Sequence, residues 1–359
     1  MALRVKGIPF KESLVPLQNK PQWYKDLVPT TLVPAVLFHG DQDQTERKVV
    51  WESDAILKSL DELFPDTPQL MLDTEEFKNA LELTEKVGSA GFRFVYGNST
   101  LGEEELLQRK NEFNKALDEV NDALDTKNGG GPFYLGAEFT GIDAILIPMM
   151  ERWRYQLPIT KELDILQGRP NLQKWFDAMD SYGPYYNRVA GDKYSWTATT
   201  SVFLRYFGGG GADDSAIAKS IQRADDSAEE LITDFAKYKQ ENEQYALEAA
   251  TKLISNHEAI VIDCTNSDPK SQQHLARATE KESTADHVLR YVASLLTSSP
   301  ASAIQEAKSA PIIQLDNPEA GSLVARTVAK RLCVPRDMGA PSAAILRSVL
   351  CTIANRLDK

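Results

Sequence analysis

Residues 32–53, LVPAVLFHGDQDQTERKVVWES, contain two apolar stretches that decide the fold of the first part of the chain. The first stretch, Leu32 to Phe38, has the composition of a buried strand. Pro34 lies near its start, although proline cannot donate a hydrogen bond to a neighbouring strand. The second stretch, VVW at residues 49–51, leads directly into Glu52 and an amphipathic helix. The segment therefore predicts two strands and a helix, with an unusual proline at the head of the first strand.

Composition and charge limit the class of protein. The chain has 359 residues, of which 42% are hydrophobic, enough for two or three cores of roughly 100–150 residues each. No apolar run approaches the roughly 20 residues that span a bilayer, and MALRVKGIPF at the start lacks a signal-peptide core. We therefore expect a cytoplasmic protein without a membrane partner. The net charge of −12 argues against a nucleic-acid partner, which would require a basic surface.

The cysteines and histidines show no spacing typical of a metal site. Cys264, Cys333 and Cys351 form no C-x-x-C pair, and the histidines form no H-E-x-x-H motif, so no metal is expected. Cys333 lies between Arg331 and Arg336, and nearby cations lower the pKa of a thiol. It is either a redox-active cysteine or a buried cysteine at a helix end. We favour the second interpretation because free cysteines are most often core residues.

Residues 1–72 read as a small α/β domain. A helix is expected after Ser53, with Ile56, Leu60 and Leu63 on one face before Pro65. Three strands are expected, at residues 9–17, 32–38 and 48–52.

Residues 73–207 read as an all-helical domain, because long helical patterns follow one another without a strand signal. Thr140 and Asp143 have the spacing of a capping box at the start of one buried helix. We interpret this helix as part of the core rather than as a catalytic element. Helices are expected at residues 74–97, 103–126 and 139–155.

Residues 208–359 read as a linker followed by a mostly helical region. Four glycines begin at Gly208, and no Lys-Ser/Thr pair follows them as a phosphate-binding loop requires, so a flexible linker is expected. Residues 256–266 fit either a short strand or a helix end. Helical patterns cover residues 228–249, as one long stripe, and residues 284–296, 319–332 and 340–357.

Pro34 and the Glu52-Ser53 pair share one chemical explanation. A proline at a strand head leaves the backbone of Val33 free to pair with an extended peptide. Ser53 offers a hydroxyl and a backbone N–H at the positive end of a helix, which suits a carboxylate, and Glu52 can receive an ammonium group. A small peptide with an α-amino acid at one end and a central thiol fits this arrangement.

The motifs resemble those of the cytosolic glutathione transferases, in particular the omega and lambda-like branches, which use a cysteine. The resemblance covers residues 1–207. It rests on KGIPF (6–10), KPQWY (20–24), LVPAVLF (32–38), ESDAIL (52–57), DELFP (61–65) and FTGIDAILIPMMERW (139–153).

The resemblance implies a fold and a ligand. It implies an incomplete thioredoxin-like α/β domain at residues 1–72, an all-α domain at 73–207 and an additional mostly α region at 208–359. Glutathione would be a substrate rather than a resident cofactor, with Val33 before a cis Pro34 pairing with its cysteinyl backbone. Glu52 and Ser53 would hold the γ-glutamyl end, and Lys20 would contact the glycyl carboxylate.

The resemblance leaves the activity open between two hypotheses. The first is a glutathione transferase with a detoxification or redox role, which conjugates glutathione to a small electrophile or reduces mixed disulfides. Dimers are common in that family, so the resemblance also raises the expectation of a homodimer. The second is a non-catalytic scaffold or interaction protein. Family members carry the catalytic residue on a loop before the first helix, whereas this sequence starts inside that helix at MALRVKG. A truncated N-terminus is therefore expected, and the catalytic residue is unknown.

The predicted linker gives a first test. Limited proteolysis of the whole chain should cut first within residues 208–214, because a glycine-rich connection exposes its backbone to a protease. Cleavage that instead begins within residues 228–249 would show that the boundary is misplaced.

Overall fold

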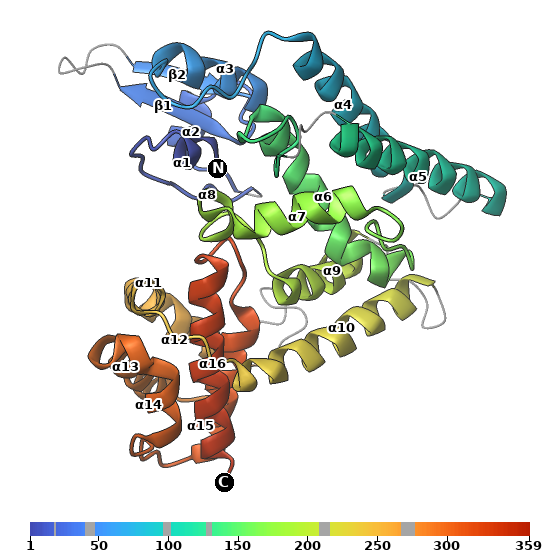
Figure 1. Ribbon diagram of the computed structural model, residues 1–359. Coiled ribbons are helices and arrows are strands. Elements are labelled where there is room, and N and C mark those ends of the chain that lie inside the picture. Colours follow the sequence, from blue (N-terminus) through green and yellow to red (C-terminus); the bar gives the residue numbers. More distant parts are fainter. Residues whose placement is uncertain (18, 40–46, 96–101, 127–130, 208–215, 267–276) are drawn as a thin grey trace. The chain divides into compact units, whose positions relative to one another are not determined.

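The computed structural model describes residues 1–17, 19–39, 47–95, 102–126, 131–207, 216–266 and 277–359 (Figure 1). Contacts within the chain divide it into two units. The first contains Met1–Met150 and Ile165–Tyr185, and the second contains Glu151–Asp164 and Tyr186–Lys359. The predicted linker at residues 208–214 lies outside the described residues.

A two-stranded antiparallel sheet forms the start of the first unit. Ala35 pairs with Trp51, and Val36 pairs with Val50. Val50, Ile56 and Leu60 form a small buried cluster between the sheet and the helix that follows it. The elements are α1 (Ala2–Val5), α2 (Gln22–Leu27), β1 (Ala35–His39), β2 (Arg47–Trp51) and α3 (Ser53–Leu63) (Figure 1).

The structure corrects two expectations for this part. Residues 9–17 form no strand, because a strand requires a hydrogen-bonded partner and the described sheet contains only β1 and β2. Leu14, in the middle of that segment, is 68% exposed. Leu63, expected on the buried face of α3, is 45% exposed because it lies in the last turn, whereas Ile56 and Leu60 are buried as expected.

One carboxylate connects three parts of this region. Asp61, on α3, accepts a 2.7 Å bond from the Nζ of Lys6, which is buried at the end of α1. The same carboxylate accepts bonds from the backbone N–H groups of Leu70 (3.0 Å) and Met71 (2.6 Å). Lys6 also donates to the carbonyl of Pro68 at 2.8 Å. Asp61 therefore fixes α3 to the end of α1 and to the segment that leads into the helical domain.

Long helices form the rest of the first unit. The helix α5 packs against both α4 and α7. These helices confirm the helical patterns that the sequence showed for this part. They are α4 (Glu75–Val95), α5 (Glu103–Thr126), α6 (Gly141–Thr160), α7 (Pro170–Ser181) and the short α8 (Gly183–Tyr186). The residues of α6 from Glu151 onward, and Tyr186 of α8, belong to the second unit.

The capping residues at the start of α6 are buried. Asp143 accepts bonds from the backbone N–H of Thr140 (2.9 Å) and of Tyr134 (2.9 Å), and from Nε1 of Trp175 (2.8 Å). Burial raises the pKa of the Asp143 carboxyl, and these hydrogen bonds oppose the rise. The expected capping contact from Asp143 to Thr140 is confirmed, and Asp143 also ties the helix to α7.

Helices are the only regular secondary structure among the described residues of the second unit. The C-terminal helix α16 packs against α11, α14 and α15. Its elements after the end of α6 are α9 (Lys193–Phe207), α10 (Ala216–Asp234), η1 (Phe235–Lys237), α11 (Glu243–Ser255), α12 (His257–Thr265), α13 (Glu282–Ser298), η2 (Pro300–Ser302), α14 (Ala303–Ser309), α15 (Pro318–Arg331) and α16 (Ala340–Leu357) (Figure 1).

Most helical patterns predicted for this region are confirmed, at 284–296, 319–332 and 340–357. The single long stripe over residues 228–249 is wrong, because α10 ends at Asp234 and α11 begins only at Glu243. Asn242 starts the second helix by accepting a hydrogen bond from the N–H of Tyr245. Residues 256–266, which the pattern left open, contain α12.

The predicted boundary at residue 208, which separates the linker and the helical region after it from the all-helical domain before it, stays a prediction. In the structure, the residues that pack with the C-terminal helices begin before that point. Arg347 on α16 is fully buried, and it donates to the Oγ of Ser195 at 3.0 Å and forms an ion pair with Asp192. The helix α9 also packs against α10. None of the described helices is both long and apolar enough to cross a membrane.

The Asp61 contacts predict a large loss of stability on substitution. Asp61→Ala leaves the buried Lys6 without its counter-ion and two backbone donors without an acceptor, so the free energy of unfolding should fall by roughly 3–5 kcal/mol. Urea denaturation measures the change. Glu62→Ala, which removes the neighbouring exposed carboxylate, is the matched control and should change stability by less than about 0.5 kcal/mol. Equal effects of the two substitutions would contradict the role given to Asp61.

Candidate functional site

The register of the sheet brings four of the five predicted site residues to one end of the hairpin. Because Ala35 lies opposite Trp51, the residues just before Ala35 and just after Trp51 adjoin the same end of the sheet. Those residues are Val33 and Pro34 on one side and Glu52 and Ser53 on the other. All four are exposed. These four residues therefore form one accessible cluster, although Glu52 follows Pro34 by 18 residues in the sequence.

The start of α3 supplies hydrogen-bond donors to this cluster. The first intrahelical bond runs from the N–H of Ile56 to the carbonyl of Glu52, at 3.0 Å. The N–H groups of Ser53, Asp54 and Ala55 precede that bond, so they have no acceptor within the helix. The positive end of the helix dipole adds to their attraction for an anion. Together with the Ser53 hydroxyl, these donors suit a carboxylate.

The backbone is strained on both sides of the cluster. Glu52 has a φ of 69° and Thr31 a φ of 55°, which are conformations that residues other than glycine rarely adopt. Such outliers concentrate at functional sites, where the surrounding structure maintains them. At Glu52 the conformation turns the chain from β2 into α3 and leaves the carboxylate exposed beside Ser53.

The Val33–Pro34 peptide bond is cis, as the family resemblance implied. No hydrogen bond within the described residues engages the backbone N–H or carbonyl of Val33. Both groups are therefore available to an extended ligand. The roles given to Val33 and Pro34 in binding stay predictions.

Lys20 is not brought into the cluster by any described contact. It is half-buried and lies two residues before α2. No hydrogen bond or ion pair within the described part of the chain connects it to the other four predicted residues. Its proposed role rests on the sequence motif alone.

Sequence reasoning missed one residue, Tyr24. Its hydroxyl donates a 2.6 Å hydrogen bond to the carbonyl of Leu32, and its side chain is buried. Tyr24 lies on α2, within the KPQWY motif. The motif was the only signal in the sequence, and it did not indicate which backbone group the hydroxyl would reach.

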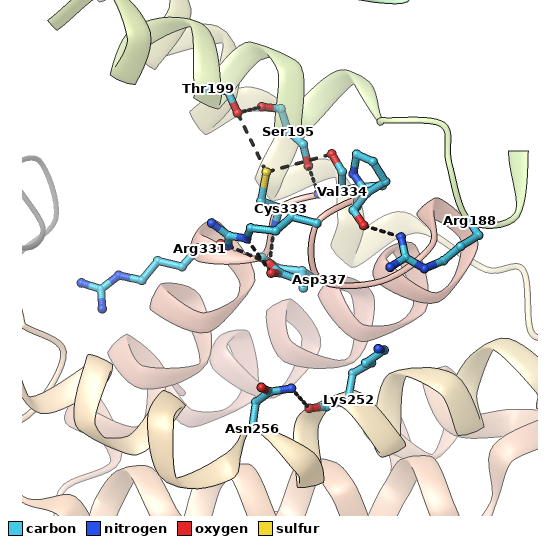
Figure 2. Close-up of polar contacts among 12 residues, drawn as sticks. Arg188, Ser195, Thr199, Lys252, Asn256, Arg331, Cys333, Val334 and Asp337 are labelled. Carbon is cyan, nitrogen blue, oxygen red and sulfur yellow. Dashed lines mark hydrogen bonds and ion pairs between the residues drawn. The ribbon is translucent and has the colours of Figure 1, made fainter. Parts of the chain in front are cut away.

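Cys333 does not have the environment of a reactive cysteine. Burial raises the pKa of its thiol, and the nearby Arg336 only partly opposes this effect. The raised pKa argues against the redox-active alternative and agrees with the interpretation favoured from the sequence, a buried cysteine at a helix end. The residue follows the end of α15 and is half-buried, with its backbone N–H donating to Asp337 at 2.7 Å (Figure 2). All three cysteines belong to the second unit, and no group of residues that could hold a metal ion occurs among the described residues.

Two family models match the sequence. The N-terminal domain of glutathione S-transferases matches residues 1–63, and the C-terminal domain matches residues 104–178. Protein IN2-1 homolog B of Oryza sativa is 31% identical over 191 residues, which cover 52% of this chain and 71% of that protein. Glutathione S-transferase L1 of Arabidopsis thaliana is 31% identical over 193 residues, which cover 53% of this chain and 75% of that protein.

Among solved structures, glutathione transferase Omega 3C from Trametes versicolor aligns with a TM-score of 0.42 at 22% identity, covering 51% of this chain and 78% of that chain. The sequence relatives carry the assignment: the chain belongs to the glutathione S-transferase family. The predicted fold class is confirmed, with a thioredoxin-like domain of few strands, a helical domain and further helices beyond both. Neither family model extends past residue 178.

The strained conformation of Glu52 predicts that two small substitutions at this position differ in stability. Glu52→Gly and Glu52→Ala both remove the carboxylate, so the two variants differ from each other only by the Cβ of alanine. Only glycine adopts a positive φ without steric cost, so the glycine variant should be more stable than the alanine variant by about 1 kcal/mol. Urea denaturation of the two variants measures the difference in stability. An alanine variant that is the more stable of the two would show that the backbone at Glu52 is not strained.

Proposed function

We propose that this protein binds glutathione at the end of the β1–β2 hairpin and uses it as a substrate, either for conjugation to electrophiles or for thiol transfer to disulfides. The observation that carries the proposal is the sheet register, which places Val33 and Pro34 beside Glu52 and Ser53. Membership of the glutathione S-transferase family supports the choice of ligand.

The proposed contacts follow the chemistry of the two ends of glutathione. The γ-glutamyl end carries an ammonium group and a carboxylate. The exposed carboxylate of Glu52 receives the ammonium group, and the donors at the start of α3, including Ser53, bind the carboxylate. The free backbone groups of Val33 pair with the cysteinyl residue. Lys20 contacts the glycyl carboxylate.

The two proposed reactions both need a thiolate, either that of a protein cysteine or that of glutathione. In conjugation, the sulfur of glutathione forms a bond to carbon and displaces a leaving group. In thiol transfer, the thiolate attacks a disulfide sulfur and releases the other thiol. An ordinary thiol has a pKa of about 8.5, so only a few per cent is ionised at pH 7. The residue that stabilises the thiolate is not assigned.

The alternative function is a non-catalytic glutathione-binding scaffold. One observation favours it: most of the second unit, Tyr186–Lys359, lies beyond the matched family domains, so its helices are not accounted for by the transferase domains. A homodimer and a cytoplasmic location stay predictions.

Calorimetric titration of the full chain with glutathione tests the binding proposal. Ser53→Ala should weaken binding more than Lys20→Ala, because Ser53 lies inside the cluster and contributes a directed contact to a charged group, worth roughly 1.5–3 kcal/mol. Lys115→Ala, which removes an exposed lysine of α5, is the control for loss of positive charge and should not change binding. Full affinity in Ser53→Ala would locate the site elsewhere, and equal losses in Ser53→Ala and Lys20→Ala would refute the ranking.

Turnover assays separate the enzyme from the scaffold. The chain is supplied with glutathione and either a chloro-dinitro aromatic electrophile or a glutathione mixed disulfide. Turnover above the uncatalysed rate that falls in Ser53→Ala supports the enzyme. Glutathione binding with no turnover of either substrate supports the scaffold.

A further inference from the structure

The hydroxyl of Tyr24 holds the peptide group that precedes the proposed ligand contact. It donates to the carbonyl oxygen of Leu32 at 2.6 Å, and the Tyr24 side chain is only 5% exposed. The carbonyl of Leu32 and the N–H of Val33 belong to one peptide group. Because that group is planar, and is trans here, a bond that fixes the direction of the oxygen also fixes the direction of the N–H.

The segment around this peptide has few other restraints. The side chains of Leu32 and Val33 are 56% and 44% exposed, so packing holds neither of them firmly. The N–H of Leu32 reaches the Oγ1 of Thr30 only at 3.4 Å. Thr31, with its φ of 55°, adopts a conformation that an unrestrained chain would leave. The N–H of Thr31 donates to the carbonyl of Val28 at 2.8 Å, but that bond lies before the Leu32–Val33 peptide group. Among the described residues, the Tyr24 bond is therefore the hydrogen bond that fixes the direction in which Val33 presents its N–H.

The helix that carries Tyr24 also starts beside Lys20. The carbonyl of Pro21 accepts a bond from the N–H of Tyr24 at 3.1 Å, so the turn after Lys20 and the Tyr24 side chain belong to one short element. The two proposed contacts with glutathione thus depend on α2 in different ways. Lys20, the proposed contact of the glycyl part, precedes the helix. Val33, the proposed contact of the cysteinyl part, depends on the helix through the hydroxyl of Tyr24.

We propose that Tyr24 is a positioning residue for glutathione, which acts by orienting the Val33 N–H toward the cysteinyl backbone of the ligand. This inference rests on the proposed function. Tyr24 does not touch the ligand in this account. Its effect on binding is exerted through the Leu32–Val33 peptide, and it should be the same for any ligand that contains the cysteinyl backbone.

Tyr24→Phe tests the proposal because it removes only the hydroxyl and keeps the buried ring. Binding to the full chain is measured by calorimetric titration with glutathione and with γ-glutamylcysteine, which lacks the glycyl residue. The dissociation constant should rise about three- to tenfold for both ligands, the effect of losing one ordinary hydrogen bond. Tyr134→Phe is the matched control, because the Tyr134 hydroxyl is buried in the same unit without a hydrogen-bond partner in the described residues, and it should leave both constants unchanged.

Three results would overturn the inference. An unchanged affinity in Tyr24→Phe, with or without a lower melting temperature, would show that the hydroxyl is merely structural. A loss for glutathione but not for γ-glutamylcysteine would show that Tyr24 acts through Lys20 and the glycyl end. Equal losses of affinity in Tyr24→Phe and Tyr134→Phe would show a general effect of removing a buried tyrosine hydroxyl. The failure of the proposed function is distinct from all three, because the unsubstituted chain would then bind neither ligand.

Discussion

The antiparallel register of β1 and β2 is the constraint on which the proposed site depends. A shift of the register by one residue would move Val33 and Pro34 away from Ser53 and would turn the buried side chain of Val50 to the opposite face. Burial of Val50 against Ile56 and Leu60 therefore fixes the same geometry that places the proposed ligand contacts together. The stability of this small core and the function proposed for the end of the hairpin therefore both depend on the register of β1 and β2.

The surrounding elements preserve that geometry by polar contacts rather than by a large core. Asp61 holds α3 from its far end, and Tyr24 holds the segment before β1. Two strands alone give marginal stability in water, so these contacts matter more here than they would in a wide sheet. The left-handed backbone at Glu52 is maintained because β2 fixes the chain before it and α3 fixes the chain after it.

The sequence was sufficient to predict the features that local patterns determine. Apolar periodicity found α4, α5 and α13, and the order of motifs identified the family and placed Glu52 at the start of α3. It could not predict contacts between distant residues. The buried Arg347 lies in an apolar stretch of α16, and its bonds to Ser195 (3.0 Å) and to the carbonyl of Leu332 (2.6 Å) depend on how three segments pack. The strand predicted for residues 9–17 was wrong for a related reason, because a strand pattern does not reveal whether a partner strand is present.

Hydrogen exchange of the full chain with and without glutathione tests the central claim most directly. If glutathione lies across the end of the hairpin, exchange should slow in peptides that cover residues 29–38 and residues 50–57, because the N–H groups of Val33 and of the first turn of α3 become hydrogen-bonded to the ligand. Slower exchange in both peptides is the result that this account predicts. Binding that protects other segments and leaves both of these peptides unchanged would contradict it.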